Sequence, residues 1–191
     1  MKLTEIIETN EYIKQHKTDK ESRHSYCSLF YQKIFENIKN KKMNILEIGI
    51  KNGSSLVLWN EFFKNSIIYG IDNSNLINNR LDIYPRIKPI IQDAYNQKIL
   101  NHLPLFDIII DDGPHTLESQ KKCIDIYFNK LKKGGVIIIE DVDGDENFEK
   151  LVSHAQKYST PIEYCDNRDK TKTNDSLVVV IKNNQDTEYL K

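Results

Sequence analysis

Acidic residues follow two of the apolar runs of this chain. Asp112 comes shortly after the run 106–110, and Glu140 and Asp141 come directly after the run 136–139. Carboxylates held close together repel one another unless a positive charge lies between them. A hard divalent cation with oxygen ligands is the simplest such charge. We therefore predict that Asp112, Glu140 and Asp141 bind a metal ion.

A histidine stands close to the first of these acidic groups. His115 lies three residues beyond Asp112, in an expected loop over the site. An imidazole with an ordinary pKa near 6.5 can remove a proton at neutral pH. We predict that His115 is a general base and that Asp112 works beside it. We interpret Asp111 and Asp143 as residues that cap turns. The remaining histidines considered lack such a setting and are expected to be solvated: His16, His102 and His154.

Glycine and carboxylate residues follow the first three apolar runs. Gly49 and Gly53 allow a tight turn and the close approach of a ligand to the backbone. Ser54 is placed to cap the next helix. Asp72 suits the two hydroxyls of a ribose, and Asp93 can accept a hydrogen bond from an adenine amino group. The order of turn, ribose and adenine predicts a nucleoside pocket. The full G-x-G-x-x-G fingerprint is missing, which argues against a nicotinamide-dependent oxidoreductase.

The elements that must position these residues are strands alternating with helices. Strand–helix alternation predicts an α/β fold with a mostly parallel sheet, helices on both faces, and ligands beyond the carboxyl ends of the strands. The last two strands are expected to form an antiparallel hairpin. The expected strands are 44–48, 67–71, 87–91, 106–110, 136–139, 161–165 and 176–182, and the expected helices between or after them include 54–63, 116–131 and 145–158.

The first forty residues have a different pattern. Apolar residues at three- and four-residue spacing predict helices over 3–13 and 26–38, with the polar stretch 16–20 as a loop. We expect a single domain over residues 1–191, in which a helical N-terminal segment, 1–40, covers a core of residues 43–182.

Composition excludes several classes of protein. The formal net charge of −1 gives no electrostatic footprint for duplex nucleic acid, so no nucleic-acid partner is expected. The three cysteines, Cys27, Cys123 and Cys165, are widely spaced, which argues against a disulfide framework or a zinc site. Neither a signal peptide nor a run of 18 apolar residues is recognised. We expect a cytoplasmic protein without a membrane partner, which can form a homo-oligomer.

Several motifs together resemble a known family. EIGIKNGSS, IYGID, FDIIIDDGPHTLESQ and GGVIIIEDV, in this order, resemble class I S-adenosylmethionine-dependent methyltransferases. More narrowly, they are similar to the metal-dependent sugar O-methyltransferases of macrolide biosynthesis, of the mycinamicin and tylosin type. TDKESRHSYCSLFYQKIF is also similar to an N-terminal segment of that group. The resemblance covers roughly residues 17–182, and its most specific element is D-D-G-x-H followed by E-D.

This resemblance implies a Rossmann-like fold with a seven-stranded sheet and an antiparallel last strand. It implies S-adenosylmethionine as methyl donor, Mg²⁺ or another divalent cation, and methylation of a sugar hydroxyl. A terminal sugar of a glycan, such as a deoxyhexose, or a nucleotide sugar is expected in preference to a large macrolide. By position, the metal ligands are Asp112, Glu140 and Asp141 and the base is His115. The cofactor-binding residues are Glu47, Gly49, Gly53, Ser54, Asp72, Asp93, Asp111, His24 and Tyr26. Arg168, Asn174 and Asp175 match a loop before the last strand.

Two other functions stay open at this stage. The same carboxylates would serve an O-methyltransferase of a catechol or another small diol, although such an enzyme would want an aromatic clamp over its pocket. A noncatalytic nucleotide-binding Rossmann module would not need five acidic and imidazole groups at two adjacent strand ends.

Overall fold

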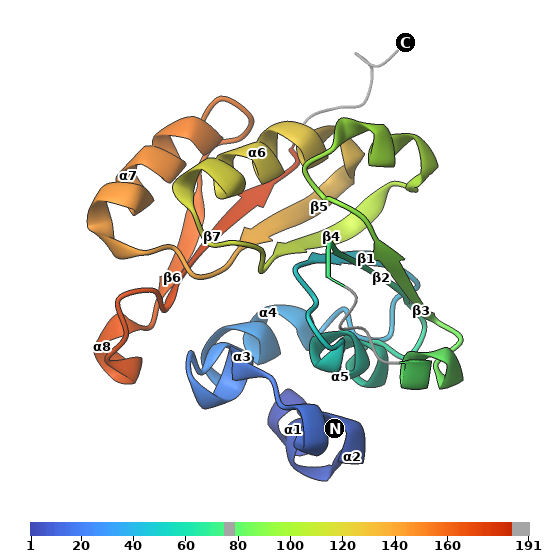
Figure 1. Ribbon diagram of the computed structural model, residues 1–191. Coiled ribbons are helices and arrows are strands. Elements are labelled where there is room, and N and C mark those ends of the chain that lie inside the picture. Colours follow the sequence, from blue (N-terminus) through green and yellow to red (C-terminus); the bar gives the residue numbers. More distant parts are fainter. Residues whose placement is uncertain (75–78, 185–191) are drawn as a thin grey trace.

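A seven-stranded sheet forms the centre of the molecule (Figure 1). The computed structural model describes residues 1–74 and 79–184, with nothing given for the side chains of 79 and 80. The strand order is β3-β2-β1-β4-β5-β7-β6; β1 to β5 are parallel, and β7 runs antiparallel to both β5 and β6. The predicted fold class and closing hairpin are therefore confirmed. The strands are β1 (Asn44–Ile48), β2 (Ile67–Asp72), β3 (Ile87–Ile91), β4 (Phe106–Asp111), β5 (Leu131–Ile139), β6 (Glu163–Asp166) and β7 (Leu177–Lys182).

Apolar side chains on both faces explain why these runs form strands. β1, β4 and β7 are buried almost throughout, as expected for strands covered by helices on both sides. β5 begins at Leu131, five residues earlier than position 136, where the sequence led us to expect it. Leu131 pairs with Phe106 across an irregularity in the register with β4, which the polar stretch after Leu131 conceals in the sequence.

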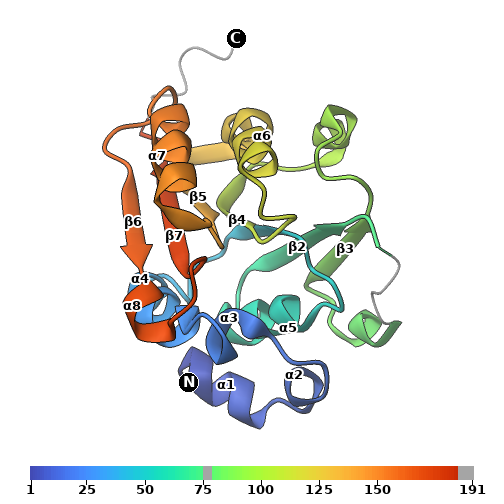
Figure 2. The ribbon, with the colours of Figure 1, turned by 60° about the vertical axis from the view of Figure 1, so that its left-hand side comes forward.

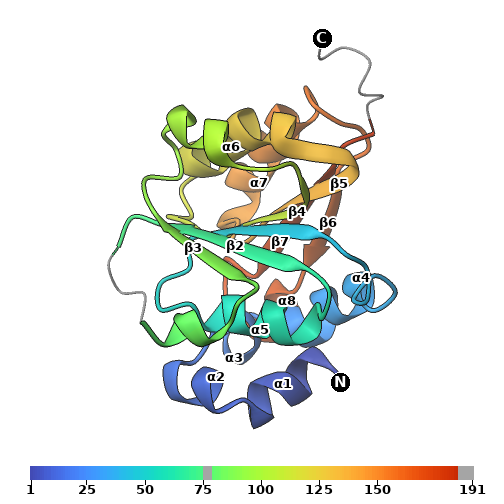
Figure 3. The same cartoon turned by 90° about the vertical axis from the view of Figure 1, so that its right-hand side faces the viewer.

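Helices cover both faces of the sheet (Figure 3). α6 (Leu117–Tyr127) and α7 (Gly144–Ala155) lie on one face, and α5 (Ser54–Phe62) and α4 (Gln32–Phe35) lie on the other. α1 (Leu3–Thr9) and α2 (Glu11–His16) pack on α5 as an additional outer layer. Within the described ranges, none of the helices combines the length and the apolar composition needed to cross a membrane. Shorter elements are α3 (Asp19–Ser22), a π-helical turn at Cys27–Tyr31, α8 (Arg168–Thr171) and 3-10 turns at Asn79–Ile83, Gln97–His102 and Phe128–Lys130.

The N-terminal segment crosses the sheet edge at which the parallel strands end. The expected loop 16–20 is wrong in detail, because α2 continues through His16 and α3 begins at Asp19. Asn10 ends α1 and caps α2 through its side chain, which breaks the single helix expected over 3–13. The chain then passes beside the connection between β6 and β7 (Figure 2), where the Arg23 guanidinium lies 2.8 Å from Asp175 Oδ2.

Candidate active site

A cavity of about 680 Å³ opens at the carboxyl ends of β1, β2 and β4. This volume lies within the range of about 300–1,000 Å³ that is typical of small-molecule and cofactor sites. Its lining includes Gly49, Ser54, Asp72, Asp93, Asp112 and His115, together with residues of the N-terminal segment, among them His16 and Asp19. Six of the residues that the sequence singled out thus meet around one space.

Asp72 holds the loop from Gly49 to Gly53, here called the glycine loop, in place as well as lining the cavity. Its Oδ2 accepts hydrogen bonds from the backbone N–H groups of Ile50 and Lys51, at 2.9 and 2.7 Å. Its Oδ1 accepts one from Ser74, at 2.8 Å. Burial alone would raise the pKa of Asp72, but these hydrogen bonds outweigh it, so the pKa lies below its ordinary value. The carboxylate is therefore ionised at neutral pH, and much of its acceptor capacity serves the loop.

Gly49 has no room for a side chain, because the backbone of the loop after β4 lies against it. Its φ is +79°, and a Cβ added there would lie 2.0 Å from the carbonyl oxygen of Asp112. The Asp112 N–H in turn donates to the carbonyl of Ile48, at 2.9 Å. At Gly49 the backbone of the loop after β1 therefore lies close to the backbone of the loop after β4.

Asp93 and Asp111 hold different positions beside this cavity. Asp93 is exposed and lines it, and its Oδ1 accepts a hydrogen bond from the Tyr95 backbone at 2.9 Å. Asp111 lies behind the cavity wall, 2% exposed, where the Tyr95 hydroxyl donates to it at 3.3 Å. Burial raises the pKa of Asp111 to about 7. Asp111 does not line the cavity itself, whereas its neighbour Tyr95 does.

Asp112, His115 and Asp141 form a group that can hold a metal ion. One ligand atom from each lies within 4.8 Å of the other two. His115 Nε2 is 3.9 Å from Asp112 Oδ1 and 3.8 Å from Asp141 Oδ2. Carboxylate oxygens are the ligands that a hard cation such as Mg²⁺ prefers, so the donor set fits such an ion. The structure thus brings together two of the three predicted metal ligands and the predicted base.

Glu140, the remaining predicted ligand, is directed into the protein. Its two carboxylate oxygens accept hydrogen bonds from the Lys20 ammonium and the Tyr31 hydroxyl. Burial raises its pKa to about 7, although Lys20 opposes the shift. Lys20 also contacts Asp112 Oδ2, at 2.8 Å, so the two acidic groups share this cation. Glu140 stays a predicted ligand, with Lys20 and Tyr31 as neighbours that the sequence did not reveal.

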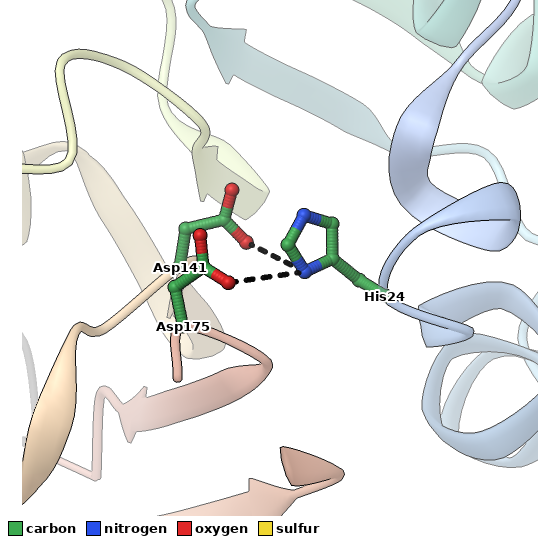
Figure 4. Close-up of side chains that lie close together, drawn as sticks. All are labelled: His24, Asp141 and Asp175. Atoms are coloured by element: carbon green, nitrogen blue, oxygen red, sulfur yellow. Dashed lines mark ion pairs between the residues drawn. The ribbon is translucent and has the colours of Figure 1, made fainter. Parts of the chain in front are cut away.

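His24 and Tyr26 lie on the far side of Asp141. His24 Nδ1 is 3.6 Å from Asp141 Oδ1 and 3.9 Å from Asp175 Oδ1 (Figure 4). The Tyr26 hydroxyl donates to Asp141 Oδ1 at 2.7 Å. Both side chains are buried, and the rings stack with centroids 5.0 Å apart. The structure places these two predicted cofactor residues where they orient Asp141, outside the lining of the large cavity.

Glu47 is likewise buried away from the cavity. Its Oε2 accepts a hydrogen bond from the Trp59 indole at 3.2 Å, and its Oε1 lies 3.0 Å from Lys20 Nζ. Gly53 lies over Leu81, whose Cδ1 would be 2.6 Å from an added Cβ. Neither residue lines the first cavity.

Two residues of this site have an unfavourable backbone conformation. His115 and Asp141 have φ angles of +59° and +54°. Residues other than glycine seldom adopt this left-handed backbone conformation. Those that do cluster at active sites and ligand clamps. The conformation turns both side chains toward the same space, which is what a shared ligand would require.

A second cavity, of about 480 Å³, adjoins the first at His115. Its lining is polar throughout: Arg23, His115, Asp141, Asp143, Thr173, Asn174 and Asp175. His115 also lines the first cavity. The loop before β7 thus contributes Asn174 and Asp175, whereas Arg168 pairs with Asp145 and Asp166 away from this space.

Some expectations about local roles are wrong. Gly53, not Ser54, holds the N-cap position of α5, and Ser54 instead donates to Asn52 Oδ1. Asp143 stands at the N-cap of α7 but makes no capping hydrogen bond with its side chain. His154 is partly buried rather than freely solvated, and its Nε2 lies 2.6 Å from Asp125 Oδ1. His16 packs on Tyr12 and lines the first cavity.

Comparisons with known proteins agree with this arrangement. Over 140 residues, 67% of this chain, it is 27% identical to the 8-demethyl-8-alpha-L-rhamnosyl tetracenomycin-C 2'-O-methyltransferase of Streptomyces olivaceus, and the match covers 36% of that protein. It is 29% identical to the demethylmacrocin O-methyltransferase of Streptomyces fradiae over 144 residues, 70% of this chain and 36% of that one. The chain therefore spans about a third of the length of these relatives. No protein-family model matches it.

The mycinamycin-pathway methyltransferase MycE, solved in complex with Mg and SAH, superposes with a TM-score of 0.71 at 23% identity. The match covers 95% of this chain and 56% of MycE. This chain has the Rossmann-like methyltransferase fold. The resemblance to sugar O-methyltransferases that the motifs indicated is confirmed as well, at low identity.

Proposed function

We propose that this chain is an S-adenosylmethionine-dependent, divalent-metal-assisted O-methyltransferase that acts on a sugar hydroxyl. The observation that carries the proposal is the place of His115, where a nucleoside-sized cavity meets a polar one. A methyl donor and an acceptor must approach each other at such a junction, with a base beside the acceptor. Two of the relatives named above are a rhamnosyl tetracenomycin-C 2'-O-methyltransferase and a demethylmacrocin O-methyltransferase. Their names support the same reaction class.

The first cavity fits the methyl donor. Asp72 and Asp93 both line it, at the ends of β2 and β3, as a ribose and an adenine would require. S-Adenosylmethionine, when bound, would supply the methyl group. The sulfonium sulfur that carries the methyl group would leave as a neutral thioether. Glu47, Asp111, His24 and Tyr26 support this site from behind rather than by lining it.

The second cavity fits a sugar better than a catechol. The described residues that line it include no Phe, Tyr or Trp to clamp an aromatic ring. They offer a guanidinium, carboxylates, an amide and a hydroxyl, which suit the hydroxyl groups of a sugar. We therefore favour a terminal deoxyhexose of a glycan or a nucleotide sugar as the acceptor.

His115 has the protonation state that a base needs. Burial lowers its pKa below the ordinary value of 6.5, although Asp141 opposes the shift, so the imidazole is neutral at pH 7. Asp112 and Asp141 would hold a divalent cation together with Glu140, and such an ion supplies a Lewis acid that lowers the pKa of a hydroxyl. Nε2 of His115, which faces both carboxylates, is the atom that would take the hydroxyl proton.

The arrangement of the chain supports a single methyltransferase domain. Residues 1–40 cover the core formed by residues 43–182 and contribute Lys20, Arg23 and His24 to the site. A noncatalytic nucleotide-binding module would have no use for the strained His115 between two cavities.

Two measurements test the proposal. Calorimetry should show binding of S-adenosylmethionine and none of NAD. Transfer of a labelled methyl group should then be measured to a panel of deoxyhexoses, nucleotide sugars and catechols, with Mg²⁺ present. Methylated sugar is the expected product. Binding of NAD in place of S-adenosylmethionine, or transfer to catechols alone, would contradict it.

A further inference from the structure

Lys20 places a fixed positive charge beneath the acidic groups of the site. Its Nζ is 3.0 Å from Glu47 Oε1 and 2.8 Å from Asp112 Oδ2, and it also donates to Glu140 Oε2. Lys20 and Glu140 are each 1% exposed, and Glu47 is fully buried. The Lys20 ammonium thus lies in ion-pair contact with three carboxylates at once.

One ammonium faces more acidic groups than it can pair. Lys20 contacts the carboxyl groups of Glu47, Asp112 and Glu140, and Asp141 lies close to Asp112 on the cavity side. Asp112 uses Oδ2 for Lys20, whereas its Oδ1 is the atom that lies nearest His115. Lys20 thus binds from inside the protein, and a second cation can bind from the cavity side.

We infer that Lys20 is a positioning residue that acts as a permanent internal cation of the metal site. It holds Asp112 and Glu140 in place before a divalent ion arrives, and it lowers the affinity of the site for that ion. This inference rests on the proposed function for the presence of a divalent ion. Without Lys20, the buried Glu140 and the partly buried Asp112 would lie close together with no protein cation beside them, which folded proteins tolerate poorly.

Binding of Mn²⁺ and thermal unfolding, both without the methyl donor, test the inference. Lys20→Met keeps an apolar chain of similar length and removes the charge. Because this variant can fail to fold, Lys20→Met/Glu47→Gln removes one positive and one negative charge together, and Glu47→Gln alone is its matched reference. Lys14→Met is the control, since Lys14 forms only an exposed pair with Glu11, three residues away.

Removal of Lys20 should tighten metal binding. Electron paramagnetic resonance of free Mn²⁺ should give a dissociation constant at least about tenfold lower for Lys20→Met/Glu47→Gln than for Glu47→Gln, because a positive charge next to the bound ion is gone. The unfolding temperature of the double variant should rise more on addition of Mg²⁺ than that of Glu47→Gln, whereas Lys14→Met should respond as wild type does. A merely structural role of Lys20 cannot produce tighter binding.

The outcomes separate this inference from the proposed function. If wild type binds Mn²⁺ but the double variant binds it no more tightly than Glu47→Gln, the inference is wrong and the metal-assisted function stands. If none of the proteins binds Mn²⁺, both the inference and the metal in the proposed function are wrong. Tighter binding with a larger response to Mg²⁺ supports both.

Discussion

Substitution of Gly49 should test whether this glycine serves the ligand or the protein. Gly49→Ala keeps a small residue but adds a Cβ at a position with φ of +79°, 2.0 Å from the Asp112 carbonyl oxygen and 2.9 Å from Gly113 Cα. Backbone atoms cannot rotate away from such a contact, so the loop after β4 must move. That loop carries Asp112 and His115.

A matched control separates the clash from the backbone conformation. Gly134 has a nearly equal φ of +77°, but an added Cβ would meet nothing within 4 Å. Gly134→Ala should therefore lower the free energy of unfolding by about 1–2 kcal/mol, the penalty of the left-handed conformation alone. Gly49→Ala adds overpacking of about 1–3 kcal/mol, which gives a total of about 2–5 kcal/mol.

Urea unfolding followed by fluorescence measures this difference. Trp59 is the single tryptophan of the chain and is fully buried, so its emission reports global unfolding. Equal destabilisation by the two substitutions would refute the packing argument. Loss of S-adenosylhomocysteine binding by Gly49→Ala without extra destabilisation would show that the ligand, rather than Asp112, requires the glycine.

Three further predictions concern the ligands and the base. Exhaustive chelation should abolish methyl transfer and Mg²⁺ should restore it; full activity in the chelator would show that Asp112 and Asp141 have another role. Asp93→Ala should weaken S-adenosylmethionine binding in calorimetry while leaving the fold intact, because Asp93 is exposed and the substitution removes only a local hydrogen bond from the Tyr95 backbone; unchanged affinity would remove it from the adenine site. His115→Ala should lower turnover by about 10²–10⁴-fold. A base must be neutral, so wild-type activity should rise with pH. Because burial lowers the pKa of His115, this rise should be centred below pH 6.5. A His115→Ala variant with near-normal turnover and the same rise of activity with pH would exclude His115 as the base.

The sequence predicted the strands well because most of them are continuous apolar runs. β1 and β3 have the expected bounds, and other strand ends differ by one or two residues. β5 is the exception, since Lys132 and Lys133 at its start carry no apolar signal and the pairing with β4 alone defines it. Strand pairing at an irregular register depends on contacts with the neighbouring strand. A local sequence pattern holds no information about those contacts.

The residues around the first cavity were predictable for a related reason. Ligands bind beyond the carboxyl ends of parallel strands, so residues that follow the apolar runs meet there. Side-chain partners from the N-terminal segment were not predictable in this way. Lys20 lies 92 residues from Asp112 and 120 from Glu140, and a polar run that contains it looks like an exposed loop. Nor does the sequence show that one carboxylate oxygen of Asp72 accepts two hydrogen bonds from the glycine loop.

Alternation along the strands nevertheless contains the signal that would have identified an internal cation. Successive side chains of a strand point to opposite faces of the sheet. In β4, Ile108 and Ile110 pack in the core beneath α5, so Asp112 continues toward that face, whereas Ile109 packs in the core beneath α6, on the side where Asp111 meets Tyr95.

The same alternation directs the other two acidic residues to the α5 face. Glu47 follows Ile45 by two positions, and Glu140 follows Ile138 by two; both isoleucines belong to the core beneath α5. The three carboxylates, Glu47, Asp112 and Glu140, therefore meet on one face of three adjacent strands. A divalent ion in the cavity can reach Asp112 from outside. It cannot balance the negative charge of Glu47, because Glu47 lies one residue before the end of β1 and is fully buried. A buried carboxylate needs a partner within the protein, and the helices that cover this face must supply it. In this chain the charged partner is Lys20, and the Trp59 indole of α5 donates a hydrogen bond to the same carboxylate.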